Sequence, residues 1–338
     1  MNIRILVANN RPVLKRMLSG NWINFLIKVG IFILLYWAIY KQVFQYQDID
    51  YIIERFKTSF GDNSLFLLLL VCFMVFFNWG LETLKWKDLM SKVENISFFN
   101  AYKAIICGIT FAVFTPNRVG EYGGRIFYLQ KANKIQAIFI TLIGSFSQIV
   151  ITISMGMLGL VFYLKQFDLG FYTSLAVWGV FLLLIVLIIA IYYNINLVYQ
   201  LLKKFHILKK VIPLFRVYKS YSFKDLSLVL VYSLLRYSIF TAQYLFLLYV
   251  FGIEVGWLNG LMIISVIFLV QTIIPSITLL ELGIRGNIAL FLIGNYSTND
   301  IAILSSSFTL WLINLIIPAA LGGFLILRLN FFNNKSVN

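Results

Sequence analysis

Two short charged stretches of this chain carry residue types that can bind an anion. Residues 121–125 have the sequence Glu-Tyr-Gly-Gly-Arg and residues 281–285 have the sequence Glu-Leu-Gly-Ile-Arg, so both follow the pattern Glu-x-Gly-x-Arg. Each stretch lies a few residues after a proline, Pro116 in the first and Pro275 in the second. An arginine guanidinium can bind a phosphate through two parallel hydrogen bonds. The repeated pattern therefore predicts one polar site to which both stretches contribute.

The sequence around these stretches is typical of a membrane protein. The chain has 338 residues, of which 61% are hydrophobic and 12% are charged, and its mean hydropathy is +0.88. A soluble domain has about 25% charged residues. The net charge of +15 falls mainly at the ends of apolar segments, so we expect contact with anionic lipid headgroups and no nucleic-acid partner. No pattern predicts a cofactor or a metal site.

The apolar segments predict six transmembrane helices. About 20 apolar residues are needed to cross the hydrocarbon core as a helix. Two further apolar regions, 101–133 and 258–294, are interrupted by proline, glycine and charged residues. The six predicted spans lie near residues 24–43, 65–81, 136–163, 172–193, 227–250 and 301–327.

Lysine and arginine are concentrated in alternate loops, which predicts the orientation of the chain. The N-terminal arm and the loops 83–99, 117–135 and 195–225 are rich in basic residues. The positive-inside rule places these segments and both termini in the cytoplasm. We expect the protein to lie in the cytoplasmic (inner) membrane. Region 101–133 then enters from the cytoplasm and returns, whereas region 258–294 does so from the opposite face. Each is predicted to be a re-entrant helical hairpin.

The predicted fold is an all-α polytopic membrane protein whose six spans and two re-entrant hairpins form an inverted repeat. The units 23–164 and 171–328 each contain two spans, a hairpin and a third span, so the second unit is upside down relative to the first. Many transporters have this plan. We expect a cytoplasmic arm at 1–22, one membrane domain at 23–330 and a cytoplasmic tail at 331–338. The sequence leaves open whether the protein forms a homo-oligomer.

The predicted site gathers polar residues from both hairpins and from two spans. Backbone groups freed by proline are tolerated in a membrane only where protein buries them or a wet cavity meets them, and each charge there costs about 2.5–3.5 kcal/mol. Glutamate and arginine four residues apart can form an ion pair on one helix, which reduces this cost. Alternatively, these charges lie at the membrane interface and only fix the topology. The candidate binding residues are Thr115, Pro116, Asn117, Arg118, Gly120, Glu121, Gly123, Arg125, Pro275, Glu281, Gly283, Arg285, Glu82 and Arg236.

Glu82 and Arg236 are included because they lie in or next to predicted spans. Glu82 shares a helix face with Asn78, Lys85 and Trp86, which predicts either a polar site or interfacial anchoring by long side chains. Arg236 lies about three turns inside its span and needs a partner or water there.

The first charged stretch is similar to a known family signature. Residues 115–121, Thr-Pro-Asn-Arg-Val-Gly-Glu, resemble the Thr-Pro-Gly-Arg-Ile-Gly-Glu signature of the lysylphosphatidylglycerol synthase/flippase family, with Asn117 in place of glycine. The segment 78–86 resembles the second span of that family. Residues 275–286 resemble its second proline–glycine motif, although Gly286 stands where the family has an acid and the carboxylate is at Glu281 instead.

The resemblance covers about residues 20–330 and implies a membrane domain that moves a lipid between the two leaflets. Some family members also carry a soluble aminoacyl-transferase domain. This sequence ends ten residues after Arg328, so we expect the stand-alone form and no lysyl transfer by the chain alone.

Three functions remain open at this point. In the first, a lipid flippase holds the phosphate of an anionic or zwitterionic headgroup with Arg118, Arg125 and Arg285, in a polar cavity between the hairpins. Glu121 and Glu281 then balance the arginines or carry a coupling ion. The second is a membrane-embedded enzyme acting on a lipid or polyprenyl phosphate, which is disfavoured because the sequence has one histidine and no cluster of aspartates. The third is a membrane scaffold that transports nothing.

Overall fold

The computed structural model of the chain contains helices joined by turns and loops in the part that it describes. It describes residues 62–113, 115, 118–165, 170–194, 217–218, 220–274 and 278–327, together with the isolated positions 30, 33 and 54. No strand occurs in these residues. The first predicted span, 24–43, lies outside them except for two positions, and the predicted N-terminal arm and C-terminal tail lie outside them altogether.

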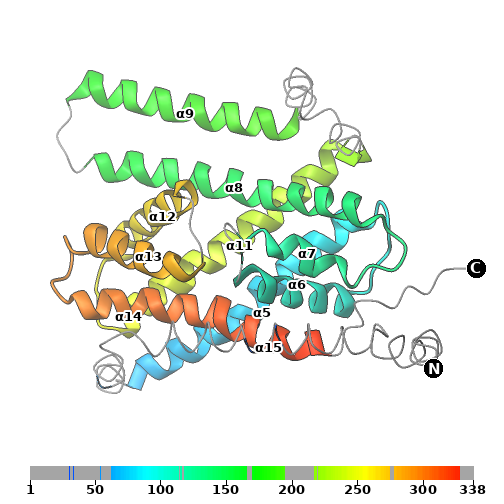
Figure 1. Cartoon of the computed structure of the whole chain (residues 1–338). Helices are drawn as coiled ribbons and strands as arrows, with labels where there is room; N and C mark the ends of the chain where they lie inside the picture. Colours follow the sequence, from blue (N-terminus) through cyan, green and yellow to red (C-terminus); the bar gives the residue numbers. More distant parts are fainter. Residues whose placement is uncertain are drawn as a thin grey trace, which may run out of the picture.

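Most of the described helices follow one another closely along the chain (Figure 1). A π-helical turn, η3, joins the last two α-helices into one continuous stretch. The elements are α5 (Asp62–Met90), α6 (Phe98–Val113), α7 (Gly120–Ile126), α8 (Lys134–Leu164), α9 (Phe171–Tyr193), α11 (Phe223–Val250), α12 (Trp257–Ile273), α13 (Thr278–Ile293), α14 (Asp300–Trp311), η3 (Leu312–Ile316) and α15 (Ile317–Leu327).

Five helical stretches in the described part are long and apolar enough to cross a membrane. They correspond to the five predicted spans that fall in this part. The helix α9 is apolar throughout and largely exposed, with one half-buried face packed on α8, as expected for a helix whose other side faces lipid. The five stretches are Ser64–Met90, Lys134–Leu164, Phe171–Tyr193, Phe223–Val250 and Asp300–Leu327.

The second predicted span was too short at its C-terminal end. We predicted 65–81, whereas α5 continues to Met90. The extra turns carry Glu82 and Lys85, which are buried and paired with each other. An apolar run alone does not reveal such a paired segment, because its charges look like the end of the span.

Polar caps mark where three of the long helices begin. The side chain of Asn133 accepts a hydrogen bond from the backbone N–H of Ile135 at the start of α8. Ser222 and Asp225 form a capping box at the start of α11. Asn299 accepts from the N–H of Ala302 at the start of α14. These bonds satisfy backbone donors that the first turn of a helix leaves unpaired.

Each interrupted apolar region forms a pair of helices. The helix α6 packs against α7, and α12 packs against α13. In the first pair the two backbones touch, because a Cβ atom added to Gly124 would lie 2.6 Å from the Cα atom of Gly108. The candidate glycine Gly123 has only open space where its side chain would be, so the close approach depends on its neighbour Gly124.

The two helix pairs contact the long helices in a reciprocal way. The helix α8, which follows the first pair, packs against α12 of the second pair through Gly156 and Gly159. The helix α15, which follows the second pair, packs against α6 of the first pair through Gly322. Figure 1 shows the two pairs at opposite ends of the long helices, with α5 and α11 crossing between them.

The apolar interior is divided into two clusters, one around each helix pair. One contains Ile105 and Ile109 of α6 and the other contains Ile264 and Ile267 of α12. The helix α5 contributes Val71 to the second cluster and its C-terminal half, from Trp79 onward, to the first. The buried polar groups of α5 and α11 therefore lie where the two clusters meet.

Candidate functional site

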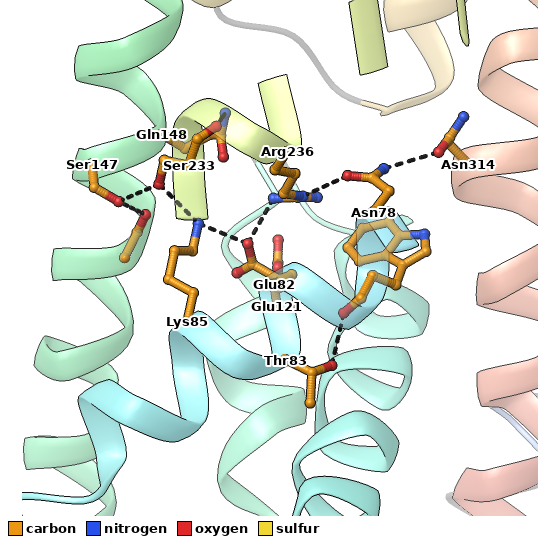
Figure 2. Close-up of polar contacts among 12 residues, drawn as sticks. Asn78, Glu82, Thr83, Lys85, Glu121, Ser147, Gln148, Ser233, Arg236 and Asn314 are labelled. Atoms are coloured by element: carbon orange, nitrogen blue, oxygen red, sulfur yellow. Dashed lines mark hydrogen bonds and ion pairs between the residues drawn. The ribbon is translucent and has the colours of Figure 1, made fainter. Parts of the chain in front are cut away.

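Glu82 is the centre of a buried cluster of charges. The residue is 4% exposed, and its Oε2 atom accepts from Lys85 Nζ and from Arg236 Nη1, each at 2.7 Å. Its Oε1 atom accepts from Arg125 Nη2 at 2.9 Å. One carboxylate thus holds three cations from α5, α7 and α11; Figure 2 shows Lys85 and Arg236 converging on it. Such a cluster requires all these helices to be in place.

The first charged stretch contributes a second carboxylate. Arg125 Nη2 also donates to Glu121 Oε1, so the ion pair predicted from their four-residue spacing is confirmed. Arg118 Nη2 lies 3.7 Å from Glu121 Oε2. Glu121 is therefore bound by two arginines, one buried and one partly exposed.

Arg118 has an unusual backbone conformation. Its φ angle is +59°, in the left-handed region that costs a residue with a side chain about 1–2 kcal/mol. Local hydrogen bonds hold this turn, since Thr115 Oγ1 accepts from Gly120 N at 2.7 Å and Thr115 O accepts from Arg118 N at 3.2 Å. Strain of this kind is concentrated at functional sites.

Hydrogen bonds extend the cluster toward the last helical stretch. Arg236 Nε donates to Asn78 Oδ1 at 2.9 Å, and Asn78 Nδ2 donates to Asn314 Oδ1 at 3.0 Å. Asn314 lies in the π-helical turn η3 and donates to the Leu310 carbonyl at 3.2 Å. The polar chain from Arg236 to Asn314 is visible in Figure 2.

A second set of hydrogen bonds connects the cluster with α8. Lys85 Nζ donates to Ser233 Oγ at 3.5 Å, and the hydroxyls of Ser233 and Ser147 lie 2.8 Å apart. Gln148 Nε2 donates to the Ser233 carbonyl at 3.3 Å. The cluster therefore joins α8, α5, α11 and η3 through buried polar contacts.

Two adjoining cavities open beside this cluster, with volumes of about 260 Å³ and 490 Å³. Residues that line only the smaller cavity include Asn78, Trp79, Arg285, Trp311 and Asn314. Residues that line only the larger cavity include Glu82, Lys85 and Glu121. Six residues line both cavities: Arg118, Gln148, Thr152, Arg236, Gln271 and Thr272.

The described charges around the cavities do not balance. The four cations Lys85, Arg118, Arg125 and Arg236 share only two carboxylates, Glu82 and Glu121, beside the cavities. Four minus two leaves an excess charge of +2, and both carboxylates are already bound by cations. The cavities are therefore suited to an anion rather than to a cation.

One residue just before the first charged stretch and one within the second line the same cavity. Arg118 precedes the first Glu-x-Gly-x-Arg pattern and Arg285 ends the second, and both line the smaller cavity. Arg285 is 6% exposed and belongs to α13. Arg125, by contrast, lines neither of these two cavities and is buried against the carboxylates.

Several predicted site residues lie outside what the structure describes. Pro116, Asn117 and Pro275 are outside the described residues, and Glu281 lies in α13 but its side chain is not described. An ion pair between Glu281 and Arg285 therefore stays a prediction. A Cβ atom added to Gly283 would meet no other atom within 4 Å, as is also the case for Gly123.

Sequence reasoning did not select many of the residues that line the cavities, including five with amide or indole side chains. Three are polar residues in or beside apolar segments, which is a signal that could have been used: Gln148, Gln271 and Asn314. The other two, Trp79 and Trp311, are aromatic residues in a chain with 32 phenylalanines, 19 tyrosines and seven tryptophans. Nothing in their spacing distinguishes them.

Long apolar helices around a charged, buried cavity define a polytopic helical membrane protein with an internal polar site. The sequence matches, over residues 25–322, the family described as lysylphosphatidylglycerol synthase TM region, and the chain belongs to this family. No curated protein and no solved structure matches it. Family membership and the apolar helices make it an integral membrane protein with a lipid-related function.

Proposed function

We propose that this protein is a lipid flippase, which moves a phospholipid or a related anionic lipid between the membrane leaflets. The headgroup occupies the polar cavities, while the acyl or prenyl chains stay in the surrounding lipid. The observation that supports this function is the excess charge of +2 in the described ion-pair cluster beside the cavities.

The charge argument rests on the cost of burying unbalanced cations. Charges taken out of water are unfavourable unless they are paired with good geometry. Glu82 and Glu121 balance only part of the positive charge. A phosphate group would supply the missing negative charge and accept hydrogen bonds from arginine in a bidentate way. Arg118, Arg236 and Arg285 line the smaller cavity and are the proposed phosphate ligands.

Arg125 has a different proposed role from the one expected from the sequence. Its Nη2 atom donates to both Glu82 and Glu121, and these contacts compete with any contact to a ligand. We assign it as a positioning residue that holds α7, and with it Arg118, beside the cavity.

The reciprocal packing of the two helix pairs supports the proposed inverted repeat. The pair α6–α7 contacts α15, and the pair α12–α13 contacts α8, as expected for two units of opposite orientation around a common site. We propose that both pairs are re-entrant hairpins and that both termini are cytoplasmic. Movement of one unit against the other would expose the cavity to each leaflet in turn.

Leaflet exchange of labelled phosphatidylglycerol in proteoliposomes tests the proposal. We expect exchange with the wild-type protein and at least a tenfold loss with Arg118→Gly, which removes the guanidinium and fits the left-handed backbone. Lys134→Ala is the control, because Lys134 is an exposed cation at the start of α8 that lines neither cavity. Absence of exchange by the folded wild type for every phosphate-bearing lipid would refute transport and favour a lipid-phosphate enzyme or a scaffold.

A further inference from the structure

We propose that the smaller cavity is an oxyanion site that admits a phosphate headgroup without an ammonium group and rejects headgroups that carry one. This inference rests on the proposed lipid-binding function and names the class of lipid: one whose headgroup has a net negative charge. An anionic glycerophospholipid and a polyprenyl monophosphate both satisfy it. An aminoacylated, cationic lipid does not.

The first argument is the direction of the hydrogen bonds that the cavity wall can make. Trp79 and Trp311 line it, are only 2% and 1% exposed, and have indole Nε1 atoms that donate to no acceptor among the described residues. Gln271 Nε2 also lacks an acceptor, whereas Gln148 Oε1 is an acceptor of the same lining that lacks a donor, so three such donors stand against one acceptor. An indole N–H can only donate. Buried donors without acceptors are unfavourable, so the wall is matched to a ligand that accepts.

Phosphate and ammonium differ in this respect as well as in charge. Phosphate oxygens accept hydrogen bonds, whereas an ammonium group has three donors and no acceptor. An ammonium placed here would bring further donors to a wall that already has unmatched donors. A phosphate would accept hydrogen bonds from the two indoles and bring the negative charge that the ion-pair cluster lacks.

The second argument is that both described carboxylates are already bound by cations. Glu82 is bound by Lys85, Arg125 and Arg236, and Glu121 is bound by Arg118 and Arg125. A headgroup ammonium would therefore have to displace a buried cation from its partner, or lie among like charges. Either arrangement disfavours a cationic headgroup.

The indole rings are held in place by packing, so their donors are preorganised. The guanidinium carbon of Arg236 lies 4.7 Å from the ring centroid of Trp79, a cation–π contact. The ring of Trp311 packs against that of Phe308 with 5.9 Å between centroids. Fixed donors bind an acceptor without the entropy cost of ordering flexible side chains.

Direct binding of short-chain lipids to the purified full-length chain in nanodiscs tests the inference. The matched pair is dihexanoyl-phosphatidylglycerol and its lysyl ester, which differ only in the aminoacyl group. We expect the lysyl ester to bind at least tenfold more weakly. Binding of geranylgeranyl phosphate is measured in parallel. The tighter binder of phosphatidylglycerol and geranylgeranyl phosphate shows whether the site takes a glycerophospholipid or a polyprenyl phosphate. Equal affinity for phosphatidylglycerol and its lysyl ester would overturn the inference.

Trp311→Phe tests the donor itself, because it keeps a ring and removes only the N–H. We expect phosphatidylglycerol to bind about tenfold more weakly, the value of one hydrogen bond to a charged group. Trp79→Phe is a second variant with the same expectation. Trp257→Phe is the matched control, since Trp257 is exposed at the start of α12 and does not line the cavity. Unchanged binding in both cavity variants would contradict the proposed donor role.

Binding and transport can fail separately. Selective phosphate binding without leaflet exchange would refute the flippase function and leave this inference standing. Exchange combined with equal binding of both lipids would support the flippase function and overturn this inference.

Discussion

Replacement of Glu82 by glutamine should destabilise the folded protein more than any other single neutralisation in the cluster. The amide has the shape of the carboxylate but no charge, so it leaves Lys85, Arg125 and Arg236 buried around a neutral group. The three cations lie 2.7–2.9 Å from the Glu82 oxygens. Removal of one partner from a buried ion pair costs about 3–5 kcal/mol. We expect a loss of at least about 3 kcal/mol in the free energy of unfolding.

The two cysteines of the chain offer an assay for this loss. Cys107 is completely buried in α6, whereas Cys72 is exposed. In a Cys72→Ser background, a thiol reagent labels Cys107 only when the structure opens. A destabilisation of about 3 kcal/mol increases the open population, and with it the labelling rate, about a hundredfold. Glu254→Gln is the control, because Glu254 is exposed in the loop after α11.

A double variant separates the charge effect from a general packing defect. Lys85→Met removes one of the cations that Glu82→Gln leaves unpaired and keeps most of the side-chain volume. We expect the double variant to be less destabilised than the sum of the two single variants, by at least about 1 kcal/mol. Labelling of Glu82→Gln at the wild-type rate, or additive effects in the double variant, would refute the buried charge cluster.

Three further predictions concern the first helix pair and its surroundings. Gly124→Ala should destabilise the fold by about 1–3 kcal/mol, because its Cβ atom would clash with Gly108. Gly123→Ala should not destabilise the fold, because its Cβ atom meets open space. Thermal melts compare the two variants. Arg118→Gly should raise stability by about 1 kcal/mol while lipid exchange falls; a less stable variant would contradict backbone strain at this position. Burial raises the pKa of Glu94, but backbone N–H groups of residues 130–132 at 2.8–3.2 Å outweigh it and lower the pKa overall. The Glu94 carboxylate should therefore stabilise the fold at neutral pH, and this stabilisation should be lost as the pH falls through the lowered pKa. Thermal melts at acidic pH should show this loss in the wild type but not in Glu94→Gln.

The sequence predicted the helices well because the hydrophobic period and length carry most of that information. The five spans in the described part were located correctly, and both interruptions were found from Pro116 and Pro275. The end of α5 was missed, since Glu82 and Lys85 looked like the polar boundary of a span. Their mutual ion pair and the partners on α7 and α11 bury them. Such partners come from distant parts of the chain, so local pattern cannot reveal them.

The site was predictable in its charges but not in its shape. Glu121 and Arg125 were expected to pair, and they do. Arg236 was expected to need a partner, and it has Glu82 and Asn78. The positive φ angle of Arg118 and the burial of two indole donors beside one cavity depend on tertiary packing. Neither leaves a trace in residue spacing.

The features of the cavity argue against the alternative that these charges only fix the topology. A network selected for stability alone would pair its charges and satisfy its donors. Here the described ion-pair cluster has four cations and two carboxylates, and two buried indoles donate to no described acceptor. The backbone is also strained at Arg118. Each feature is unfavourable for folding, yet all three occur at one cavity while the surrounding helices pack through glycine contacts. A bound oxyanion would compensate the charge and the donors at once, which is why we favour ligand binding over a structural role.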